Sequence, residues 1–217
     1  MRTQTALLAR SIRPAPVANE DADCLEIKGA ARTFARDQEV FGEGENADFV
    51  YKVVSGAVRT FRVLADGRRQ ICDFYLPGDI FGVDLGEDRT ATAEVVGDTI
   101  LIMARRASVA AAPGAGIKLW RHAARDLERT REHALTLGRR SACERVASLL
   151  VELADRTCAE GTLELPMSRQ DMADYLGLTI ETVSRTLTQL QAVGLIDARG
   201  CRHVRLIDRE GLTELCQ

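Results

Sequence analysis

The chain has 217 residues, of which 46% are hydrophobic and 28% charged, and its formal net charge is −3. This length can hold one or two domains. The apolar runs are too short to cross a membrane, and Met1 to Asn19 lack the hydrophobic stretch of a signal peptide, so we expect a cytoplasmic protein. A slightly acidic chain has little bulk attraction for nucleic acid, so any nucleic-acid contact has to come from a local cluster of arginines.

The first part of the chain is predicted to form an arm followed by a β-domain. Residues 1–20 are rich in Ala, Pro and Arg without steady periodicity, which indicates a loose arm. Over residues 21–112, short alternating runs are separated by glycine-containing turns, and Asp66-Gly67 is a hairpin signal. The runs cover residues 49–54, 57–64, 69–76 and 90–96. Strands this short, at this spacing, predict an all-β barrel or jelly roll.

A long helix is predicted over residues 113–138, introduced by Pro113-Gly114. Residues at alternating spacings of four and three would form a coiled-coil seam: Ala123, Leu127, Thr130, Ala134 and Leu137. The flanks of this seam are dense in Arg and Glu, which suit solvent or interhelical ion pairs. We therefore expect a dimerisation helix, and a helix packed only on its own barrel is the alternative.

Residues 139–217 are predicted to open with another helix. Ser141 and Glu144 have the spacing of a capping box, in which each side chain satisfies a backbone N–H of the other residue. The apolar residues that follow are expected to point inward: Val146, Leu149, Leu150 and Leu153. In this part of the chain Asp and Glu outnumber Arg, and Lys is absent, so a phosphate-binding surface must again be local.

Two shorter helices follow, joined by a turn that contains Gly177. Ser168 can cap the first, and Gly177 permits the left-handed conformation that ends it. Apolar residues at helical spacing fix one face of the second to the core: Ile180, Val183, Leu187, Leu190 and Val193. Its opposite face carries Glu181, Ser184, Arg185 and Thr188 at i, i+3, i+4 and i+7.

This polar face matches what a DNA major groove offers. Glu181, Ser184 and Arg185 can accept from cytosine, contact a thymine methyl group and donate twice to guanine. Two short helices with the polar face on the second predict a helix-turn-helix. An ordinary helical hairpin with a solvated face is the alternative.

A β-hairpin is predicted next, over residues 194–200 and 202–207, which would make the helix-turn-helix a winged one. Arg199, Arg202 and Arg205 lie on or near it and can reach phosphates. The remaining candidates for backbone contacts are Ser168, Arg169, Thr179, Thr182 and Thr188. The chain is thus predicted to be an α+β protein with an N-terminal β-barrel or jelly roll, a long dimerisation helix and a C-terminal winged helix-turn-helix.

Over roughly residues 21–215 the sequence resembles the CRP/FNR family of bacterial transcription regulators. The resemblance rests on the turns Val54-Ser55-Gly56-Ala57-Val58 and Leu76-Pro77-Gly78-Asp79-Ile80-Phe81-Gly82, and on the run from Leu176 to Arg185. Glu181, Ser184 and Arg185 look like the Glu-x-x-Ser-Arg reading motif of the FNR and FixK branches. The cyclic-AMP branch has an additional Arg where this chain has Ile180.

The resemblance implies a fold and a function. The barrel would be of the cyclic-nucleotide-binding type, and the protein would be a homodimer that binds palindromic double-stranded DNA, reads a TTGA-type inverted repeat and works with RNA polymerase, as a regulator rather than an enzyme. Glu181, Ser184 and Arg185 would take the base-reading roles. The best match is the FixK branch, which implies an activator of genes for oxygen limitation, respiration or nitrogen fixation.

The cyclic-nucleotide cassette of the family is incomplete. That cassette places a ribose-holding Glu after Phe-Gly and, after some intervening residues, an Arg that neutralises the phosphate. Here Phe81-Gly82 is followed by Val83-Asp84-Leu85, and Arg89-Thr90-Ala91 arrives early, across a shortened loop. We therefore expect Arg89 to be a surface charge at a strand start and the barrel not to bind a cyclic nucleotide.

Other sensing chemistry also lacks its ligands. An FNR-type iron–sulfur cluster needs four thiolates, and the corresponding part of this chain offers only Cys24 and Cys72. His122, His133 and His203 all lie outside the barrel, so neither an axial haem ligand nor a metalloenzyme site is expected inside it. We expect no cofactor and no effector, as in the FixK branch, and a regulator gated by a cyclic nucleotide, a diatomic gas or a redox signal is the alternative.

Cysteine supplies one redox candidate. The six cysteines are scattered and form no C-x-x-C pair. Cys201 stands beside Arg202 and His203, a setting that favours the thiolate and would make it redox-sensitive. The alternative is an incidental thiol that behaves as a small hydrophobe.

Overall fold

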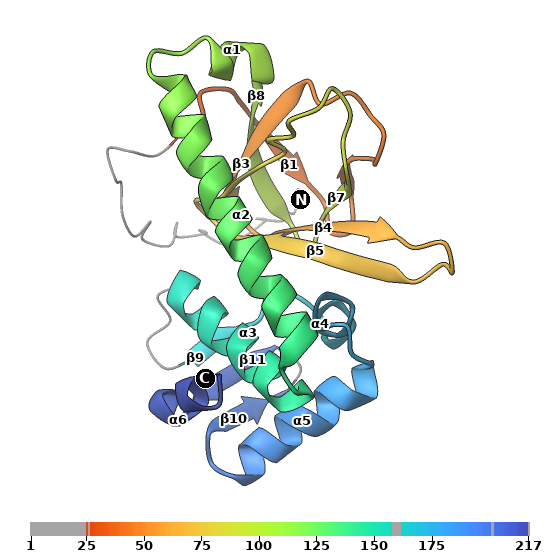
Figure 1. Cartoon of the computed structure of the whole chain (residues 1–217), viewed down its shortest axis with the longest axis vertical. Helices are drawn as coiled ribbons and strands as arrows, with labels where there is room; N and C mark the ends of the chain where they lie inside the picture. Colours follow the sequence, from red (N-terminus) through yellow and green to blue (C-terminus); the bar gives the residue numbers. More distant parts are fainter. Residues whose placement is uncertain (1–24, 26, 158–161, 201, 217) are drawn as a thin grey trace, which may run out of the picture.

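The computed structural model describes residue 25 and residues 27–157, 162–200 and 202–216, so the arm expected over residues 1–20 lies outside the described part. Figure 1 shows a β-domain above, a mainly helical domain below, and one long helix that runs past the first and reaches the second. The order of these parts along the chain is the one predicted from the sequence.

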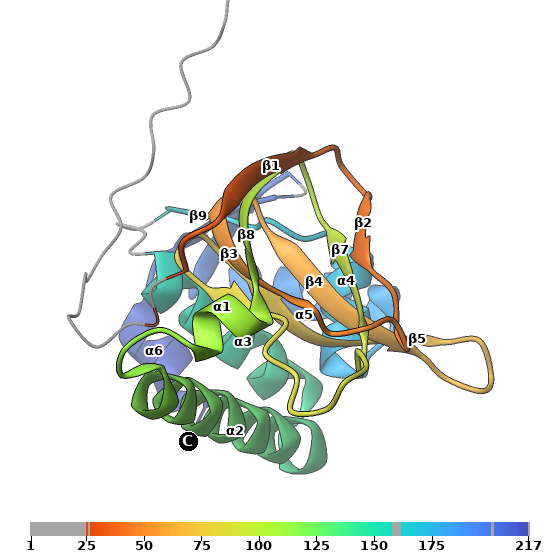
Figure 2. The same cartoon turned by 90° about the horizontal axis from the view of Figure 1, so that it is seen from above.

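The β-domain consists of two four-stranded antiparallel sheets (Figure 2). The first has the order β1 (Ala30–Phe34), β8 (Thr99–Arg105), β3 (Phe49–Ser55) and β6 (Ile80–Phe81). The second has the order β2 (Glu39–Phe41), β7 (Thr92–Val95), β4 (Val58–Val63) and β5 (Arg69–Tyr75). Strands that are distant in the sequence pair with each other, which confirms the predicted barrel or jelly roll.

Aromatic side chains fill the space between the two sheets. Tyr51 stacks on Phe81 with ring centroids 5.1 Å apart, and Phe41 lies 5.5 Å from Tyr51. The predicted hairpin joins β4 to β5, and Gly67 occupies its turn with φ of 82°, which favours glycine. In the second sheet β5 is an edge strand, so one of its sides is open to another part of the chain.

Helix α1 (Arg106–Ala110) leads through Gly114, with φ of 72°, into α2 (Ala115–Arg139). Figures 1 and 2 show α2 running along one side of the barrel and on to the C-terminal domain. Arg129 on α2 pairs with Asp73 on β5 at 3.1 Å. Helix α2 is therefore fixed to its own barrel on one face, and its other face is open.

The C-terminal domain is a winged helix-turn-helix. Its elements are α3 (Ala142–Thr157), β9 (Thr162–Glu164), α4 (Arg169–Leu176), α5 (Ile180–Ala192), β10 (Ile196–Arg199), β11 (His203–Leu206) and α6 (Arg209–Glu214). The capping box is confirmed, because Ser141 donates its N–H to the Glu144 carboxylate at 2.8 Å and its hydroxyl accepts from the Glu144 N–H at 3.4 Å. Strand β9, which extends the predicted hairpin to a three-stranded sheet, was not anticipated.

One hydrophobic core runs from the barrel into the C-terminal domain. Ile71 and Phe74 on β5 belong to the same buried cluster as Leu150 on α3 and Leu176 on α4. The rings of Phe74 and Tyr175 meet edge to face with centroids 5.3 Å apart. The C-terminal domain is thus docked on the edge strand of the barrel. None of the helices in the described part of the chain combines the length and apolar character that a membrane crossing requires.

Candidate nucleic-acid interface

Local hydrogen bonds fix both ends of α4 and the start of α5. Ser168 caps α4, because its hydroxyl accepts from the Asp171 N–H at 3.1 Å while the Asp171 carboxylate accepts from the Ser168 N–H, also at 3.1 Å. Gly177 ends α4 with φ of 61°, as predicted. Thr179 then caps α5 by accepting from the Thr182 N–H at 3.2 Å. The turn between the two helices is therefore closely defined.

The buried face of α5 is shorter than predicted. Val183, Leu187 and Leu190 are at most 2% exposed, as expected. Ile180 is 37% exposed and Val193 is 69% exposed, so placing these two in the core was wrong. Ile180 is the first residue of the helix and Val193 follows its last, where neighbouring elements no longer cover the side chain.

The opposite face of α5 presents the predicted reading residues. Glu181, Ser184, Arg185 and Thr188 are all exposed on this one helix. The backbone N–H at the helix start and the Thr179 hydroxyl lower the pKa of Glu181, so its carboxylate remains an ionised acceptor. The Thr188 hydroxyl donates to the Ser184 carbonyl at 3.0 Å, which leaves its oxygen free to act only as an acceptor.

Most candidates for backbone contacts lie at the helix starts or in the wing, and Thr188 lies within α5. Thr179 is exposed and Thr182 half-buried, with their hydroxyls 3.1 Å apart. Ser168 and Arg169 are half-buried at the start of α4, and the Ser168 hydroxyl donates to Asp171 at 2.7 Å, so its main task is the cap.

The wing lies against the reading helix. The Gln191 side chain on α5 accepts from the Ala198 N–H of β10 at 3.2 Å. Arg199 is exposed and pairs with Asp197 at 2.7 Å, while Arg202 is half-buried near the turn. Cys201, the redox candidate, lies outside the described residues.

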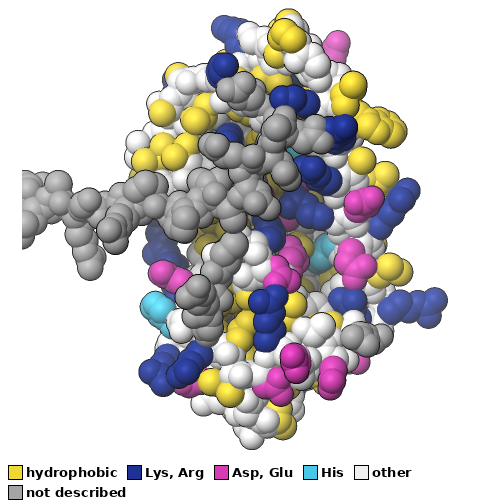
Figure 3. Space-filling model, turned by 90° about the vertical axis from the view of Figure 1, so that its left-hand side faces the viewer, with side chains coloured by type: hydrophobic (Ala, Val, Ile, Leu, Met, Phe, Trp, Pro, Cys, Tyr) yellow, Lys and Arg dark blue, Asp and Glu magenta, His cyan; other side chains and the backbone are white. Residues whose placement is uncertain are grey.

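The surface charge around the two domains is mixed. Figure 3 shows, on the face it presents, Lys and Arg side chains interspersed with Asp and Glu rather than gathered in one broad basic patch. With a net charge of −3, phosphate attraction must come from individual arginines near α5 and the wing. Base contacts then carry more of the discrimination between DNA sequences.

Arg89 in the barrel is not the surface charge that the sequence predicted. It is 3% exposed, and its guanidinium donates to the Gly82 carbonyl at 2.8 Å, to the Asp84 carboxylate at 2.9 Å and to the Phe49 carbonyl. It also lies over the Phe41 ring, 4.0 Å from the ring centroid. The short loop turns the side chain inward, where acceptors of its own chain engage Nη1 and Nη2 while the buried Nε has no hydrogen-bond partner.

The hollow beside Arg89 does not suit a cyclic nucleotide. It encloses about 360 Å³ and is lined by Phe41, Thr60, Arg62, Cys72, Tyr75, Gly82, Val83, Asp84, Thr90 and Ala91. Arg62 is the cation of this lining, and it is engaged by Glu43 at 2.8 Å. The carboxylate of Asp84 would repel a phosphate, and no Glu of this lining stands ready to hold a ribose.

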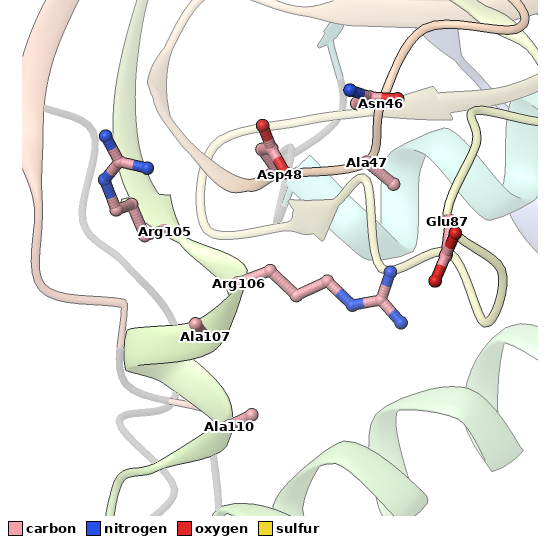
Figure 4. A pocket seen from close by; sticks show the side chains of 8 residues that line it. All are labelled: Asn46, Ala47, Asp48, Glu87, Arg105, Arg106, Ala107 and Ala110. Carbon is pink, nitrogen blue, oxygen red and sulfur yellow. The ribbon is translucent and has the colours of Figure 1, made fainter.

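A second hollow, of about 490 Å³, lies next to α1, at the end of the barrel away from the C-terminal domain (Figures 1 and 4). Figure 4 shows Arg106 extending across it toward the loop of Glu87 while Arg105 points away. Arg106 donates to the carbonyls of Gly86 and Leu85. The polar groups of this hollow therefore hold the loop to α1 and do not converge on a common point.

The residues of the predicted seam on α2 share one face but differ in exposure. Ala123 and Leu137 are half-buried against their own protomer, whereas Leu127, Thr130 and Ala134 are exposed. The large exposed apolar side chains of α2 are Ile117, Trp120, Leu127 and Leu135, with exposures of 64%, 74%, 49% and 57%. At 100° per residue these four form one stripe, and Thr130 lies about a quarter-turn away from it. The sequence prediction did not include Ile117 and Trp120. Together with Ala124 and Leu127 they follow spacings of three, four and three, which is the pattern that could have identified them.

The histidines of α2 are packed rather than solvated. His133 stacks on Tyr175 of α4 with centroids 4.1 Å apart, and burial lowers its pKa. His122 stands 3.4 Å from Asp126, and burial lowers its pKa as well. Across the described residues, no three His, Cys, Asp or Glu side chains gather in a way that could hold a metal ion.

Comparison with known proteins agrees with this geometry. A family model described as a cyclic nucleotide-binding domain matches residues 31–112, and one described as a Crp-like helix-turn-helix domain matches residues 144–215. The chain is 45% identical to the nitrogen fixation regulation protein FixK of Azorhizobium caulinodans, over 94% of this chain and 84% of that protein. It is 42% identical to the transcriptional activatory protein AadR of Rhodopseudomonas palustris, over 73% and 70% of the two chains. The structure of FixK2 from Bradyrhizobium japonicum superimposes with a TM-score of 0.84 at 42% identity, covering 88% of this chain and 98% of the other.

Proposed function

The chain belongs to the CRP/FNR family of transcription regulators, in its FixK branch, and from this premise we propose that it is a homodimeric transcription activator that reads a TTGA-type inverted repeat without a small-molecule effector. It acts on DNA together with RNA polymerase, as a regulator rather than an enzyme. The similarity to nitrogen fixation regulation proteins supports target genes of nitrogen fixation or oxygen limitation. The rival is a regulator of the same family gated by a cyclic nucleotide, a diatomic gas or a redox signal.

The observation that carries the DNA-reading role is the division of α5 into two faces. Val183 and Leu187 anchor one face, while Glu181, Ser184 and Arg185 are exposed together on the other. A helix presented in this way enters the major groove with its first turns against the base edges. The Arg185 guanidinium can then donate twice to one guanine, and the Glu181 carboxylate can accept from a cytosine.

Dimerisation through α2 supports the palindromic site. Ile117, Trp120, Leu127 and Leu135 form an exposed apolar stripe that a second α2 would cover, with Ala134 beside it. Two copies related by a two-fold axis place two α5 helices on successive major grooves about one helical turn apart. Ala123 and Leu137 are half-buried within the protomer and contribute less to this contact.

The Trp120→Asp change tests that contact. A carboxylate at the centre of the stripe would be buried against its symmetry mate, so sedimentation should show monomers and palindrome affinity should fall by about 100-fold or more. Thr130→Asp is the matched control, because Thr130 is exposed on the same helix but lies off the stripe. A monomeric Thr130→Asp variant with a dimeric Trp120→Asp variant would restore the seam predicted from the sequence.

The closed barrel supports effector independence. A phosphate would need a free cation, but Arg89 is engaged by Gly82, Asp84 and Phe49. A ligand shifts a two-state regulator only through a difference in affinity for its two states, and an occupied arginine offers none. The free dimer should therefore already hold the arrangement that binds DNA.

Binding-site selection from random duplex DNA tests the whole proposal. Purified protein without additives should select a TTGA-type palindrome in aerobic buffer, and millimolar cyclic AMP or cyclic GMP should leave the operator affinity unchanged. Anaerobic protein should behave in the same way. A tenfold tightening by either nucleotide, or a strict need for anaerobic protein that carries iron and sulfide, would favour the ligand-gated rival.

A further inference from the structure

Four charged side chains join the barrel to the first helix of the helix-turn-helix. We call Arg59 on β4, Arg69 on β5, and Asp171 and Asp174 on α4 the interdomain clamp. Asp171 accepts from Arg59 at 3.1 Å and from Arg69 at 2.7 Å. Arg69 also pairs with Asp174 at 2.8 Å.

The clamp is largely shielded from water. The side chains of Arg59 and Asp171 are 9% and 4% exposed, and those of Arg69 and Asp174 are 26% and 14% exposed. The guanidinium of Arg59 is also fixed within the barrel, because it pairs with Glu94 on β7 and with Asp37 at 3.3 Å. The barrel therefore offers α4 a pair of arginines whose positions are already set.

Asp171 connects the clamp to the reading helix. The same carboxylate that receives the two arginines closes the capping box of α4 through Ser168. The far end of α4 is fixed by Arg145, which donates to the Leu176 carbonyl at 2.9 Å and to the Leu137 carbonyl of α2 at 2.7 Å. Since α5 follows α4 after a short defined turn, the direction of α4 sets the direction of α5.

We propose that Arg59 and Arg69, acting on Asp171 and Asp174 of α4, are positioning residues that hold the reading helix in its DNA-binding orientation in place of a ligand. The inference rests on the proposed function and supplies its physical basis. The shared hydrophobic core favours docking of the two domains but allows sliding and rotation, because apolar contact is non-directional. Charged hydrogen bonds have narrow geometry, so they select one docked orientation.

Energetics agrees with a positioning role more than with a stabilising one. A buried ion pair roughly balances its Coulomb attraction against the cost of removing both ions from water, whereas loss of one partner leaves an uncompensated charge. Arg59 also serves carboxylates outside the clamp, because it pairs with Glu94 and Asp37, so the loss of one arginine leaves buried carboxylates uncompensated. A dimer reads a palindrome only when both heads have the correct spacing, which makes half-site spacing a direct readout of that orientation.

Arg69→Met tests the clamp in the full-length dimer. Methionine keeps most of the apolar stem and removes the charge, and Arg69 is the more exposed of the two arginines. Wild type should prefer the selected palindrome strongly over versions whose half-sites are one or two base pairs further apart. In Arg69→Met that preference should fall about tenfold, since only a fraction of the heads retains the competent orientation, while affinity for a single half-site should stay the same.

Two further variants and one control separate positioning from folding. Asp174→Asn keeps the side-chain shape and should reproduce the loss of spacing preference. Arg69→Lys keeps a cation between the aspartates but loses the guanidinium that donates to both, so it should restore only part of the preference. Arg62→Met is the matched control, because Arg62 lies on β4, is 60% exposed and pairs with Glu43 of the same domain.

Hydrogen exchange on the free dimers provides a readout that needs no DNA. Arg69→Met and Asp174→Asn should speed exchange of amides in α4 and β5, and Arg62→Met should not. Unchanged exchange and unchanged spacing preference in both clamp variants, or equal losses in Arg62→Met, would overturn the clamp. If additive-free wild type selects no palindrome, the proposed function fails, and the exchange pattern alone then decides whether the clamp orients the domain.

Discussion

Arg89 in the barrel and Arg185 in the C-terminal domain both stand at positions that the family resemblance links to binding, and the two domains treat these arginines in opposite ways. Arg89 is buried in the barrel, where carbonyls and a carboxylate of its own chain accept from its Nη1 and Nη2. Arg185 is exposed on α5, beside other polar side chains that point away from the core. Burial and partners, rather than residue type, therefore distinguish Arg89 from Arg185, the arginine that we propose to contact DNA.

The same comparison supports the proposal that this barrel acts without a ligand. Arg89 is turned inward, and the edge strand β5 carries Arg69, which contacts α4. The barrel thus supports the reading domain through side chains of the chain itself. In this arrangement the two domains share one hydrophobic core and one set of ion pairs.

The Arg89→Met change should produce the largest effect, on stability. Removing the guanidinium leaves the Asp84 carboxylate without its cation, although Thr90 still donates to it, and takes a donor from two carbonyls, so the free energy of unfolding should fall by about 3–5 kcal/mol. Denaturant titration of the full chain measures this loss. The folded fraction should keep its operator affinity, and Arg62→Met, which removes an exposed pair, should change stability by less than about 1 kcal/mol.

Arg185→Ala should show the converse behaviour. Loss of the two donors should reduce operator affinity by about 1–3 kcal/mol and relax the preference at one guanine of each half-site. Unfolding should be unchanged, because Arg185 is exposed. Equal weakening on the selected operator and on random DNA would show that Arg185 contacts the phosphate backbone instead, and the contrast with Arg89 would then be one of charge alone.

The sequence predicted the elements of both regions because their signals are local. Alternation, glycine turns and capping residues fix strands and helices within a few neighbours, and Ser141 and Gly177 behave as their positions imply. The exposed polar face of α5 follows from helical periodicity in the same way. The two ends of the buried face of α5 were predicted incorrectly, at Ile180 and Val193, since burial of a side chain at a helix end depends on other elements.

The misses concern contacts between parts of the chain that are distant in the sequence. The sequence around Arg89 does not indicate that its loop turns the side chain over the Phe41 ring. The sequence around Asp171 does not indicate that it accepts a hydrogen bond from Arg59, which is more than a hundred residues away in the chain. Charged residues are usually exposed, so the sequence predicts them on the surface. Here they are buried because each is paired with a residue of opposite charge. Exposure along α2 depends on the same kind of contact, since the packing of the barrel decides which face of the helix remains open.

The smallest expected effect concerns the junction between the two regions, where His133 on α2 stacks on Tyr175 on α4. Burial lowers the pKa of His133, so the unfolded chain binds a proton more readily than the folded one below about pH 6.5. His133 therefore contributes stability above that pH, which is lost as the pH falls toward the folded pKa.

His133→Phe keeps an aromatic ring against Tyr175 and removes the titration, so the melting temperature of this variant should fall less than that of wild type between pH 7.5 and pH 5.5. Asp73 acts in the opposite sense, because burial raises its pKa to about 6 and its protonation favours the folded state, but it is present in both proteins. The difference between the two melting curves thus isolates the histidine. Identical pH dependence in the two proteins would mean that the pKa of His133 is the same in the folded and unfolded states and that the junction is open to water. It would then weaken the case that α2 and α4 are held together as firmly as β5 and α4.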